Sequence, residues 1–265
     1  MTRRIRLLTV IALAILGISV MAYPTFSSYI NAIHCSRAIQ SLTARLHAAD
    51  SDTLRQQREL AEEYNRGTIP DQYDDILDFG NGVMGWIHIP DIGVELSIYH
   101  GVSDAVLQKG VGHLSASALP IGGAGTHCVL TGHTGLPSAE LFTDLTELTA
   151  GDLFYLHVLD EILVYEVDQI TVVLPHQVEE LQPVPGRDWC TLVTCTPYGI
   201  NTHRLLVRGE RVNTDTEEVL PAESIGPESA TALPGELILA GSTIFLLLAA
   251  GGLLLMRNDK GGCNA

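Results

Sequence analysis

The chain has 265 residues, of which 46% are hydrophobic, 6% are aromatic and 17% are charged, and its formal net charge at pH 7 is −16. This length suffices for one domain of ordinary size with appendages. The strongly acidic balance argues against binding to nucleic acids or anionic lipids, because like charges repel.

The first 24 residues contain an apolar segment, Ile5 to Ala22, whose only charge is Arg6. As a helix this segment would be about 27 Å long, which is enough to cross a bilayer. It also fits a cleavable signal peptide, because basic residues precede an apolar core and Val20-Met21-Ala22 makes an acceptable cleavage site. Residues 1–24 are therefore interpreted as an N-terminal transmembrane segment or a signal peptide, and either one predicts export of the residues that follow.

Residues 25–66 are predicted to form two helices, since apolar side chains recur there at helical spacing. Asp50 or Ser51 can cap the second helix, and Gly67 suits its end. Residues 67–84 are predicted to be a linker, because they are rich in aspartate and glycine and contain Pro70.

Residues 85–212 are predicted to form a mainly β domain. Short apolar or alternating runs are bounded there by Gly, Pro, Asn or Asp, as in strands joined by turns. The eight predicted strands are 85–89, 96–99, 127–131, 153–158, 163–167, 169–173, 190–194 and 204–208. This pattern predicts a closed all-β sheet with small helices between the strands.

Residues 213–236 are predicted to be a second linker, followed by an uncharged apolar segment at 237–256 and a short tail at 257–265. The apolar segment would be about 30 Å long as a helix and is interpreted as a transmembrane helix. Basic residues precede the first apolar segment and follow the second one. The positive-inside rule therefore places both ends of the chain in the cytoplasm and the β domain outside the cell membrane.

The most informative residues are a cysteine, a histidine and an arginine near the ends of predicted strands. Cys195 ends an apolar run in TLVTCTPYG, and Arg204 begins the next run in NTHRLLVRG. His133 lies in the glycine-flanked turn TGHTG, just after another strand-like run. Taken singly, such residues are more often a core thiol, a turn histidine and a solvated arginine. Their shared position favours catalysis, because exposed strand ends often carry chemistry.

These three side chains have the chemistry that acyl transfer needs. Only the thiolate form of a cysteine attacks carbonyls, and a nearby cation stabilises it. Arg204 cannot lose its proton, so it can stabilise a developing oxyanion throughout the reaction. His133 can protonate a leaving amine and later accept a proton from the incoming nucleophile. We therefore predict that His133, Cys195 and Arg204 are catalytic.

The three strings also resemble the histidine, cysteine and arginine motifs of sortases. Across roughly residues 83–212, further segments are similar to the class C, pilin-polymerising branch of that family: IPDIGVELSIYHGVSDAVLQKGVGHL, ALPIGGAG, LFTDLTELTAGDLFYLHVL and YEVDQITVVLP. The resemblance implies a closed eight-stranded sortase-type β-barrel with His133, Cys195 and Arg204 as catalytic residues. It also implies a transpeptidase that cleaves an LPxTG-like sorting signal and transfers it to a lysine of another pilin subunit.

Two further expectations concern the substrate groove of such a barrel. Thr194, Thr196 and Tyr198 are expected to line it, since they are neighbours of the cysteine. Pilin-polymerising sortases commonly carry a lid marked by an Asp-Pro-aromatic element, and this chain has no such tripeptide. Asp78-Phe79 supplies an acid and a ring without the proline, so we expect either a degenerate lid at these two residues or an open groove.

Cys128 precedes His133 by five residues, as Cys190 precedes Cys195. If the two strands are neighbours, as the resemblance implies, Cys128 and Cys190 lie at equal depth. Because five is odd and side chains alternate along a strand, both should face away from the catalytic pair. They could form a disulfide in an oxidising compartment, but adjacent parallel strands seldom offer the required geometry. Two buried thiols are the favoured interpretation.

The remaining cysteines and the histidines give no sign of a cofactor. Cys35 and Cys263 are expected to be incidental. The histidines have no zinc-binding spacing with carboxylates or cysteines, so zinc is not expected. The acidic stretch Asp71 to Asp78 offers oxygen ligands for calcium but lacks the order of an EF-hand, and no metal or other cofactor is assigned.

The predicted partners are the membrane and pilin subunits that carry an LPxTG-like signal and an acceptor lysine, without nucleic acid. Three alternatives stay open. The first is a sortase that attaches surface proteins to peptidoglycan, the second is a hydrolytic cysteine peptidase, and the third is a non-enzymatic surface adhesin.

Overall fold

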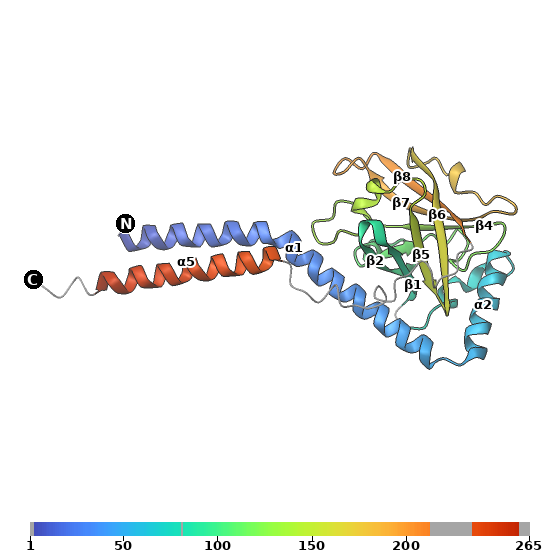
Figure 1. The fold of residues 1–265 in the computed structure, drawn as a ribbon, viewed down its shortest axis with the longest axis horizontal. Coiled ribbons are helices and arrows are strands. Elements are labelled where there is room, and N and C mark those ends of the chain that lie inside the picture. Colours follow the sequence, from blue (N-terminus) through green and yellow to red (C-terminus); the bar gives the residue numbers. More distant parts are fainter. Residues whose placement is uncertain (1–2, 81, 213–234, 260–265) are drawn as a thin grey trace, which may run out of the picture.

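The structure of the chain is a computed structural model that describes residues 3–80, 82–212 and 235–259. It consists of a long N-terminal helix, a second helix, a β-barrel and a C-terminal helix (Figure 1). The helices are α1 (Arg3–Ala48), α2 (Ser51–Asn65), α3 (Asp104–Leu107) and α5 (Gly235–Asp259). Short 3₁₀ turns are η1 (Pro70–Asp75), η2 (Pro90–Ile92), η3 (Thr143–Glu147) and η4 (Glu179–Leu181). The strands are β1 (Val83–Ile89), β2 (Val94–His100), β3 (Val111–His113), β4 (Thr126–Thr131), β5 (Leu153–Val158), β6 (Glu161–Val173), β7 (Asp188–Thr196) and β8 (His203–Arg211).

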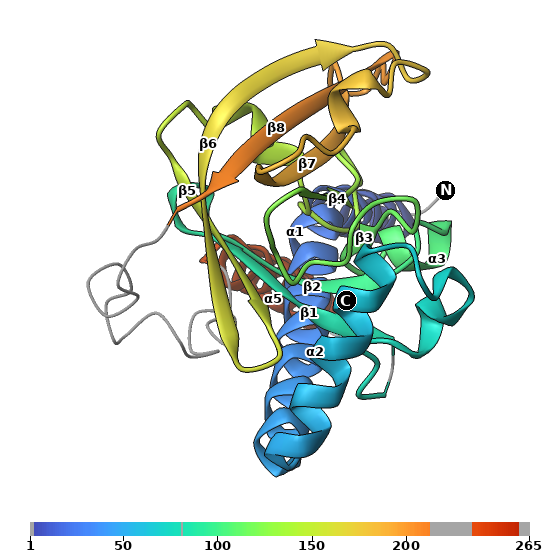
Figure 2. The same ribbon diagram turned by 90° about the vertical axis from the view of Figure 1, so that its right-hand side faces the viewer.

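The strands close into a barrel in the order β1-β2-β3-β4-β7-β8-β6-β5 (Figure 2). The pairs β2–β3 and β4–β7 are parallel. All other neighbouring strands are antiparallel. The predicted closed, eight-stranded, mainly β barrel is therefore confirmed. The parallel pair β4–β7 brings the motif that contains His133, which follows β4, next to the motif that contains Cys195, on β7.

The strand predictions differ from the structure at two places. The predicted strands 163–167 and 169–173 are both part of β6, whose register against β8 shifts between Val167 and Gln169. Asp168 occupies this β-bulge, and its charge interrupts the apolar pattern without ending the strand. β3 spans only Val111–His113, which is too short for an alternating pattern to show in the sequence.

The barrel interior holds the main hydrophobic core, and α2 packs against it. Inside the barrel, the rings of Phe154 and Tyr165 stack with their centroids 5.4 Å apart. Ala61 of α2 is fully buried. The Asp50 carboxylate accepts a hydrogen bond from the Thr53 amide at 2.7 Å, so Asp50 is the N-cap of this helix.

α1 continues without a break from the apolar N-terminal segment onto the barrel (Figure 1). Its C-terminal part packs on β1 and β2 and buries Cys35, Ile39 and Leu42. The Cys35 sulfur accepts a hydrogen bond from the Ser97 amide at 3.0 Å, so this cysteine helps to fix the helix on the barrel. The expectation that Cys35 is incidental was wrong, whereas Cys263 lies outside the described residues.

Among the described residues, α1 is the one helix that is long and apolar enough to cross a membrane. α5 lies beside the N-terminal half of α1 (Figure 1). Within the described residues of α5, the apolar helical run is Ile238–Leu248, and the side chains of most residues after it lie outside the description. A second transmembrane segment over residues 237–256 therefore stays a prediction.

Candidate active site

Cys195 and Arg204 lie opposite each other on the antiparallel strands β7 and β8. Side chains alternate along β7, so that Leu192 belongs to the barrel core while Val193 and Cys195 line a groove on the outer face. Cys195 is a free, partly exposed thiol. The strand pairing therefore presents a thiol and a guanidinium side by side on the surface of the barrel.

His133 is brought to the same place by the loop after β4. The Gly132 amide donates a hydrogen bond to the Val193 carbonyl at 3.0 Å, and the Thr194 hydroxyl donates to the Gly132 carbonyl at 2.8 Å. The His133 carbonyl accepts a hydrogen bond from the Phe142 amide at 3.1 Å. Glycine is required at position 132, because a Cβ there would lie 2.7 Å from a ring carbon of Phe142. These contacts hold the His133 loop beside the end of β7.

His133, Cys195 and Arg204 line one groove with a volume of about 360 Å³. The groove has an apolar floor on β4, β7 and β8, where buried side chains form a cluster separate from the main core. The members of that cluster are Val129, Val193 and Leu206. Further lining comes from the segment before β3 and from the connection between β6 and β7: Val102, Leu107, Pro175, Gln177, Val178 and Leu181.

The positive charge of Arg204 has no carboxylate partner among the described residues. The Arg204 guanidinium donates hydrogen bonds to the backbone carbonyls of His203 and Asn201, at 3.0 and 3.3 Å. None of the ion pairs found in the described part of the chain includes Arg204. The carbonyl contacts therefore orient the guanidinium, and its charge stays available to stabilise a thiolate or an oxyanion.

Comparison with known proteins agrees with this geometry. Residues 87–212 match the sortase domain family. Sortase C1 from Streptococcus agalactiae is 45% identical, with a TM-score of 0.66 over 68% of this chain and 100% of that chain. Sortase C from Streptococcus pneumoniae is 42% identical, with a TM-score of 0.64 over 67% of this chain and 97% of that chain. This chain belongs to the sortase family. The predicted family is confirmed, its structural neighbours are class C sortases, and the predicted enzyme class, a cysteine transpeptidase, is that of the family.

A curated relative matches over a smaller share of its length. Sortase A of Streptococcus agalactiae is 31% identical over 150 residues, which are 54% of this chain and 60% of the relative. This sortase thus spans about three fifths of the length of that relative.

Of the three predicted substrate-binding residues of the sortase, only Thr194 is part of the groove lining. Its side chain is buried and its hydroxyl is bonded to the loop that carries His133, so it positions that loop. Thr196 lies at the end of β7, outside the lining. Tyr198 is 69% exposed, and its ring covers Gly135, where a Cβ would lie 2.9 Å from the ring.

The candidate lid residues Asp78 and Phe79 do not line the groove. The Asp78 carboxylate accepts hydrogen bonds from the amides of Gly80 and Gly82, at 2.7 and 3.1 Å, and so closes a local turn. Phe79 packs against the main core, and its carbonyl accepts a hydrogen bond from Arg45 of α1 at 2.7 Å. Of the two expected arrangements, a degenerate lid at these residues finds no support, because turn formation and core packing engage both residues outside the groove that contains Cys195.

Sequence reasoning missed the groove residues contributed by the β6–β7 connection and by the segment before β3. Pro175, Val178 and Leu181 lie in a stretch without strand alternation and without residue types that perform catalysis. The only local signal is that apolar side chains occur in a connection that is otherwise polar and acidic. Such a signal is too weak to assign these residues to a groove.

Cys128 and Cys190 face each other on the parallel strands β4 and β7, at the predicted register. Both belong to the main core, on the opposite side of their strands from the groove, and both are free thiols in the structure. Burial raises the pKa of the Cys190 thiol. The predicted orientation of the pair is confirmed, and these thiols lie in the core of the sortase rather than at its surface.

A buried histidine of the barrel has structural partners. The His113 ring lies 2.9 Å from the Tyr73 hydroxyl through Nδ1 and 2.8 Å from the Ala118 carbonyl through Nε2. Within the described ranges, no group of three or more His, Cys, Asp or Glu side chains is arranged to hold a metal ion.

Proposed function

We propose that this sortase is a membrane-anchored cysteine transpeptidase that polymerises pilin subunits, with His133, Cys195 and Arg204 as its catalytic residues. One observation carries the proposal. Cys195 and Arg204 are paired across β7 and β8, and His133 lines the same groove. Membership of the sortase family supports the reaction class.

In the first half of the reaction, the Cys195 thiolate attacks the threonine carbonyl carbon of an LPxTG-like sorting signal. The tetrahedral intermediate carries an oxyanion, which Arg204 stabilises because a guanidinium keeps its charge and can donate several hydrogen bonds. Charged His133 gives its proton to the glycine nitrogen as the Thr–Gly amide bond breaks. The products are a thioester on Cys195 and a free amine.

In the second half of the reaction, the ε-amine of a lysine in another pilin subunit attacks the thioester carbonyl carbon. Neutral His133 accepts the proton of the attacking amine, and Arg204 again stabilises the oxyanion. The thiolate of Cys195 then leaves, and an isopeptide bond joins the two subunits. The apolar floor of the groove, formed by Val129, Val193 and Leu206, suits the apolar residues at the start of the sorting signal.

Pilin subunits are proposed as substrates because of the relatives. Sortase C of Streptococcus pneumoniae, whose structure was related to its pilin substrate specificity, is 42% identical to this chain. Attachment of surface proteins to peptidoglycan would use the same chemistry with a different amine. The identity of the acceptor amine therefore distinguishes the two functions.

The proposal includes a membrane anchor on each side of the barrel. The apolar part of α1 and residues 237–256 would span the bilayer, with both ends of the chain in the cytoplasm and the barrel outside. The continuity of α1 from the apolar segment onto the barrel supports an anchor that is retained rather than cleaved.

The test is a search for the acyl-enzyme. The full chain, purified in detergent, is incubated with a peptide that carries an LPxTG-like signal, and its intact mass is measured. We expect a thioester adduct on Cys195 that hydroxylamine removes and that the variant Cys195→Ala does not form. Addition of a lysine-bearing pilin fragment should yield the ligated product.

Two outcomes would count against the proposal. A folded protein that never forms an adduct on Cys195 is not a transpeptidase. An adduct that resolves only to the hydrolysed peptide, with pilin lysine present, indicates a hydrolytic peptidase, and transfer only to a peptidoglycan amine indicates the cell-wall function.

A further inference from the structure

The β6–β7 connection, residues 174–187, lines the groove although almost all of it lies on the surface. Leu181 is the only residue of this connection that is partly buried, and it packs on the apolar floor of the groove. Within this connection, therefore, only the side chain of Leu181 is held in place by burial of apolar surface. Polar contacts have to fix the rest of it.

His127 on β4 makes one of these polar contacts. Its ring is 1% exposed, with Nδ1 at 3.2 Å from the Gln182 carbonyl and Nε2 at 2.7 Å from the Thr191 hydroxyl. A carbonyl oxygen only accepts hydrogen bonds, so Nδ1 carries the proton and Nε2 accepts from the Thr191 hydroxyl. Gln182 directly follows Leu181, so this bond fixes the chain next to the groove floor.

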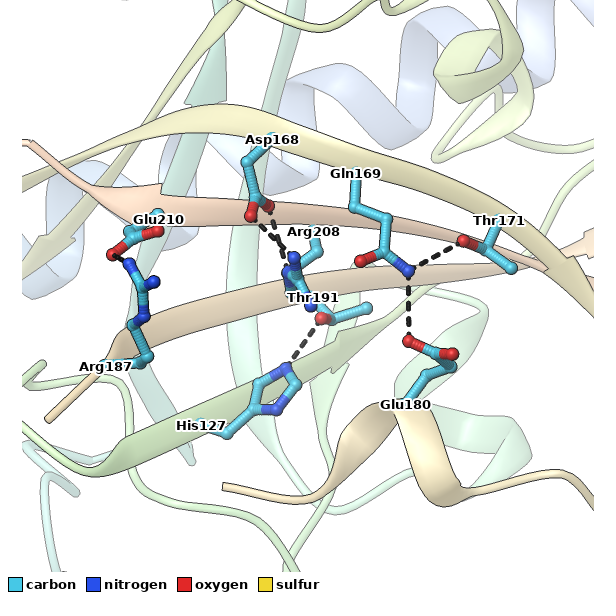
Figure 3. A network of polar contacts seen from close by, with 9 residues as sticks. All are labelled: His127, Asp168, Gln169, Thr171, Glu180, Arg187, Thr191, Arg208 and Glu210. Atoms are coloured by element: carbon cyan, nitrogen blue, oxygen red, sulfur yellow. Dashed lines mark hydrogen bonds and ion pairs between the residues drawn. The ribbon is translucent and has the colours of Figure 1, made fainter. Parts of the chain in front are cut away.

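The orientation of the His127 ring is itself fixed by a row of side chains across the outer face of the barrel. The ring packs edge-on against Trp189, with centroids 5.6 Å apart, and the Arg208 guanidinium lies 3.9 Å from the centre of the Trp189 ring. Arg208 in turn donates two hydrogen bonds to Asp168, at 3.0 and 2.6 Å. Figure 3 shows His127 on β4 and Arg208 and Asp168 on the adjacent strands β8 and β6, with β7 between β4 and β8.

Gln169 makes a second contact on the other side of Leu181. Its side-chain amide donates hydrogen bonds to the Glu180 carboxylate at 3.0 Å and to the Thr171 hydroxyl at 2.9 Å (Figure 3). Glu180 directly precedes Leu181 in η4. Leu181 is therefore held from both sides. Gln169 bonds the preceding residue, Glu180, and His127 bonds the following residue, Gln182.

We infer that His127 and Gln169 are positioning residues for the transpeptidation proposed above. They keep Leu181 and Val178 where these side chains line the groove, and so they set the affinity for the sorting signal. Neither residue lines the groove that contains Cys195. Their loss should weaken binding of the signal and leave the chemical step nearly unchanged, since uniform binding affects KM and not kcat.

The experiment uses two near-isosteric substitutions of His127. His127→Asn keeps an N–H donor near the position of Nδ1 and so can still bond the Gln182 carbonyl. His127→Gln places its amide near the position of Nε2 and loses that bond. Gln169→Leu keeps the size of the side chain and removes the donor to Glu180.

Binding is measured by fluorescence anisotropy of a labelled LPxTG-like peptide, with each substitution placed in a Cys195→Ala background so that no acylation occurs. We expect His127→Gln and Gln169→Leu to weaken binding about three- to tenfold, the effect of one lost hydrogen bond, and His127→Asn to bind within about twofold of the parent. With Cys195 restored, KM should rise in parallel while kcat stays within about twofold.

Equal peptide affinity in all three folded variants would overturn the inference, as would equal weakening by His127→Asn and His127→Gln. If His127→Gln does not fold, Gln169→Leu decides, and unchanged affinity there overturns the inference. A peptide that fails to bind even the Cys195→Ala parent would instead overturn the proposed function, so the two failures are distinguishable.

Discussion

At the scale of single residues, hydrogen bonding decides what a polar side chain does. Thr194 precedes the candidate nucleophile directly, and its position in the sequence predicts contact with substrate. In the structure, Thr194 is buried and its hydroxyl donates a hydrogen bond to the Gly132 carbonyl, directly before His133 in the loop. A threonine next to Cys195 can therefore either contact the substrate or support the neighbouring loop, and only its hydrogen-bond partner shows which of the two it does.

This assignment predicts the effect of removing one hydroxyl. Thr194→Val should lower the free energy of unfolding by about 1 to 3 kcal/mol, because the Gly132 carbonyl loses its buried donor. The rate of acylation should fall as well, because the His133 loop loses a contact. Thr194→Ser keeps the hydroxyl and serves as the control. Denaturant unfolding and single-turnover acylation measure both effects, and identical behaviour of the Val and Ser variants would refute the positioning role.

At the scale of secondary-structure elements, the outer face of β1 and β5 contains a buried imidazole. His157 lies opposite Trp86 in the register of these strands, and their rings stack with centroids 4.4 Å apart at an angle of 7°. Burial, with a smaller contribution from the nearby His88, lowers the pKa of His157 to about 4. The stacked pair therefore depends on a neutral imidazole.

The depressed pKa of His157 predicts a loss of stability in acid. The unfolded chain binds a proton at this residue below about pH 6.5, whereas the folded chain does so only below about pH 4. The contribution of neutral His157 to the free energy of unfolding is thus complete above the pKa of the unfolded chain, and it is lost as the pH falls from about 6.5 to 4. Between pH 7 and pH 4, the free energy of unfolding of the parent protein should fall by about 2 to 3 kcal/mol more than that of the variant His157→Phe. Denaturant unfolding at both pH values tests this, and equal losses in the two proteins would contradict it.

At the scale of the whole molecule, the described cysteines separate into two environments. Cys35 is buried where α1 packs on β2, and Cys128 and Cys190 are buried in the barrel core, whereas Cys195 is partly exposed in the groove. The fold therefore makes one described thiol accessible and shields the others behind packed side chains.

The difference in burial predicts selective labelling. In a Cys263→Ser background, a charged methanethiosulfonate reagent should modify Cys195 in the folded protein, and the three buried thiols should react only after unfolding. Intact mass followed by peptide mapping gives the sites. Rapid labelling of Cys128 or Cys190 under native conditions would mean that the barrel opens, and resistance of Cys195 would favour a non-enzymatic protein.

Local rules made most strands predictable from the amino-acid sequence, as well as the meeting of His133, Cys195 and Arg204 in one groove, whose catalytic role is the function proposed above. Alternation along strands assigned the opposite orientations of Cys190 and Cys195, and turn residues marked most strand ends. Asp168 misled the prediction of β6, because a charged residue looks like a turn until Arg208, from another strand, neutralises it. β3 left no pattern, because three residues are too few to alternate visibly.

The contacts that complete the groove could be seen only in three dimensions. Leu181 reaches the groove because His127, more than fifty residues earlier in the chain, bonds its neighbour Gln182. Cys35 became a structural residue only once α1 lay on β2, and Asp78 proved to be a turn residue only when its amide partners were visible. The physical reason is common to all three. Strand alternation and turn formation depend on neighbours in sequence, whereas a hydrogen-bond partner or a packing surface far along the chain exists only after the barrel has closed.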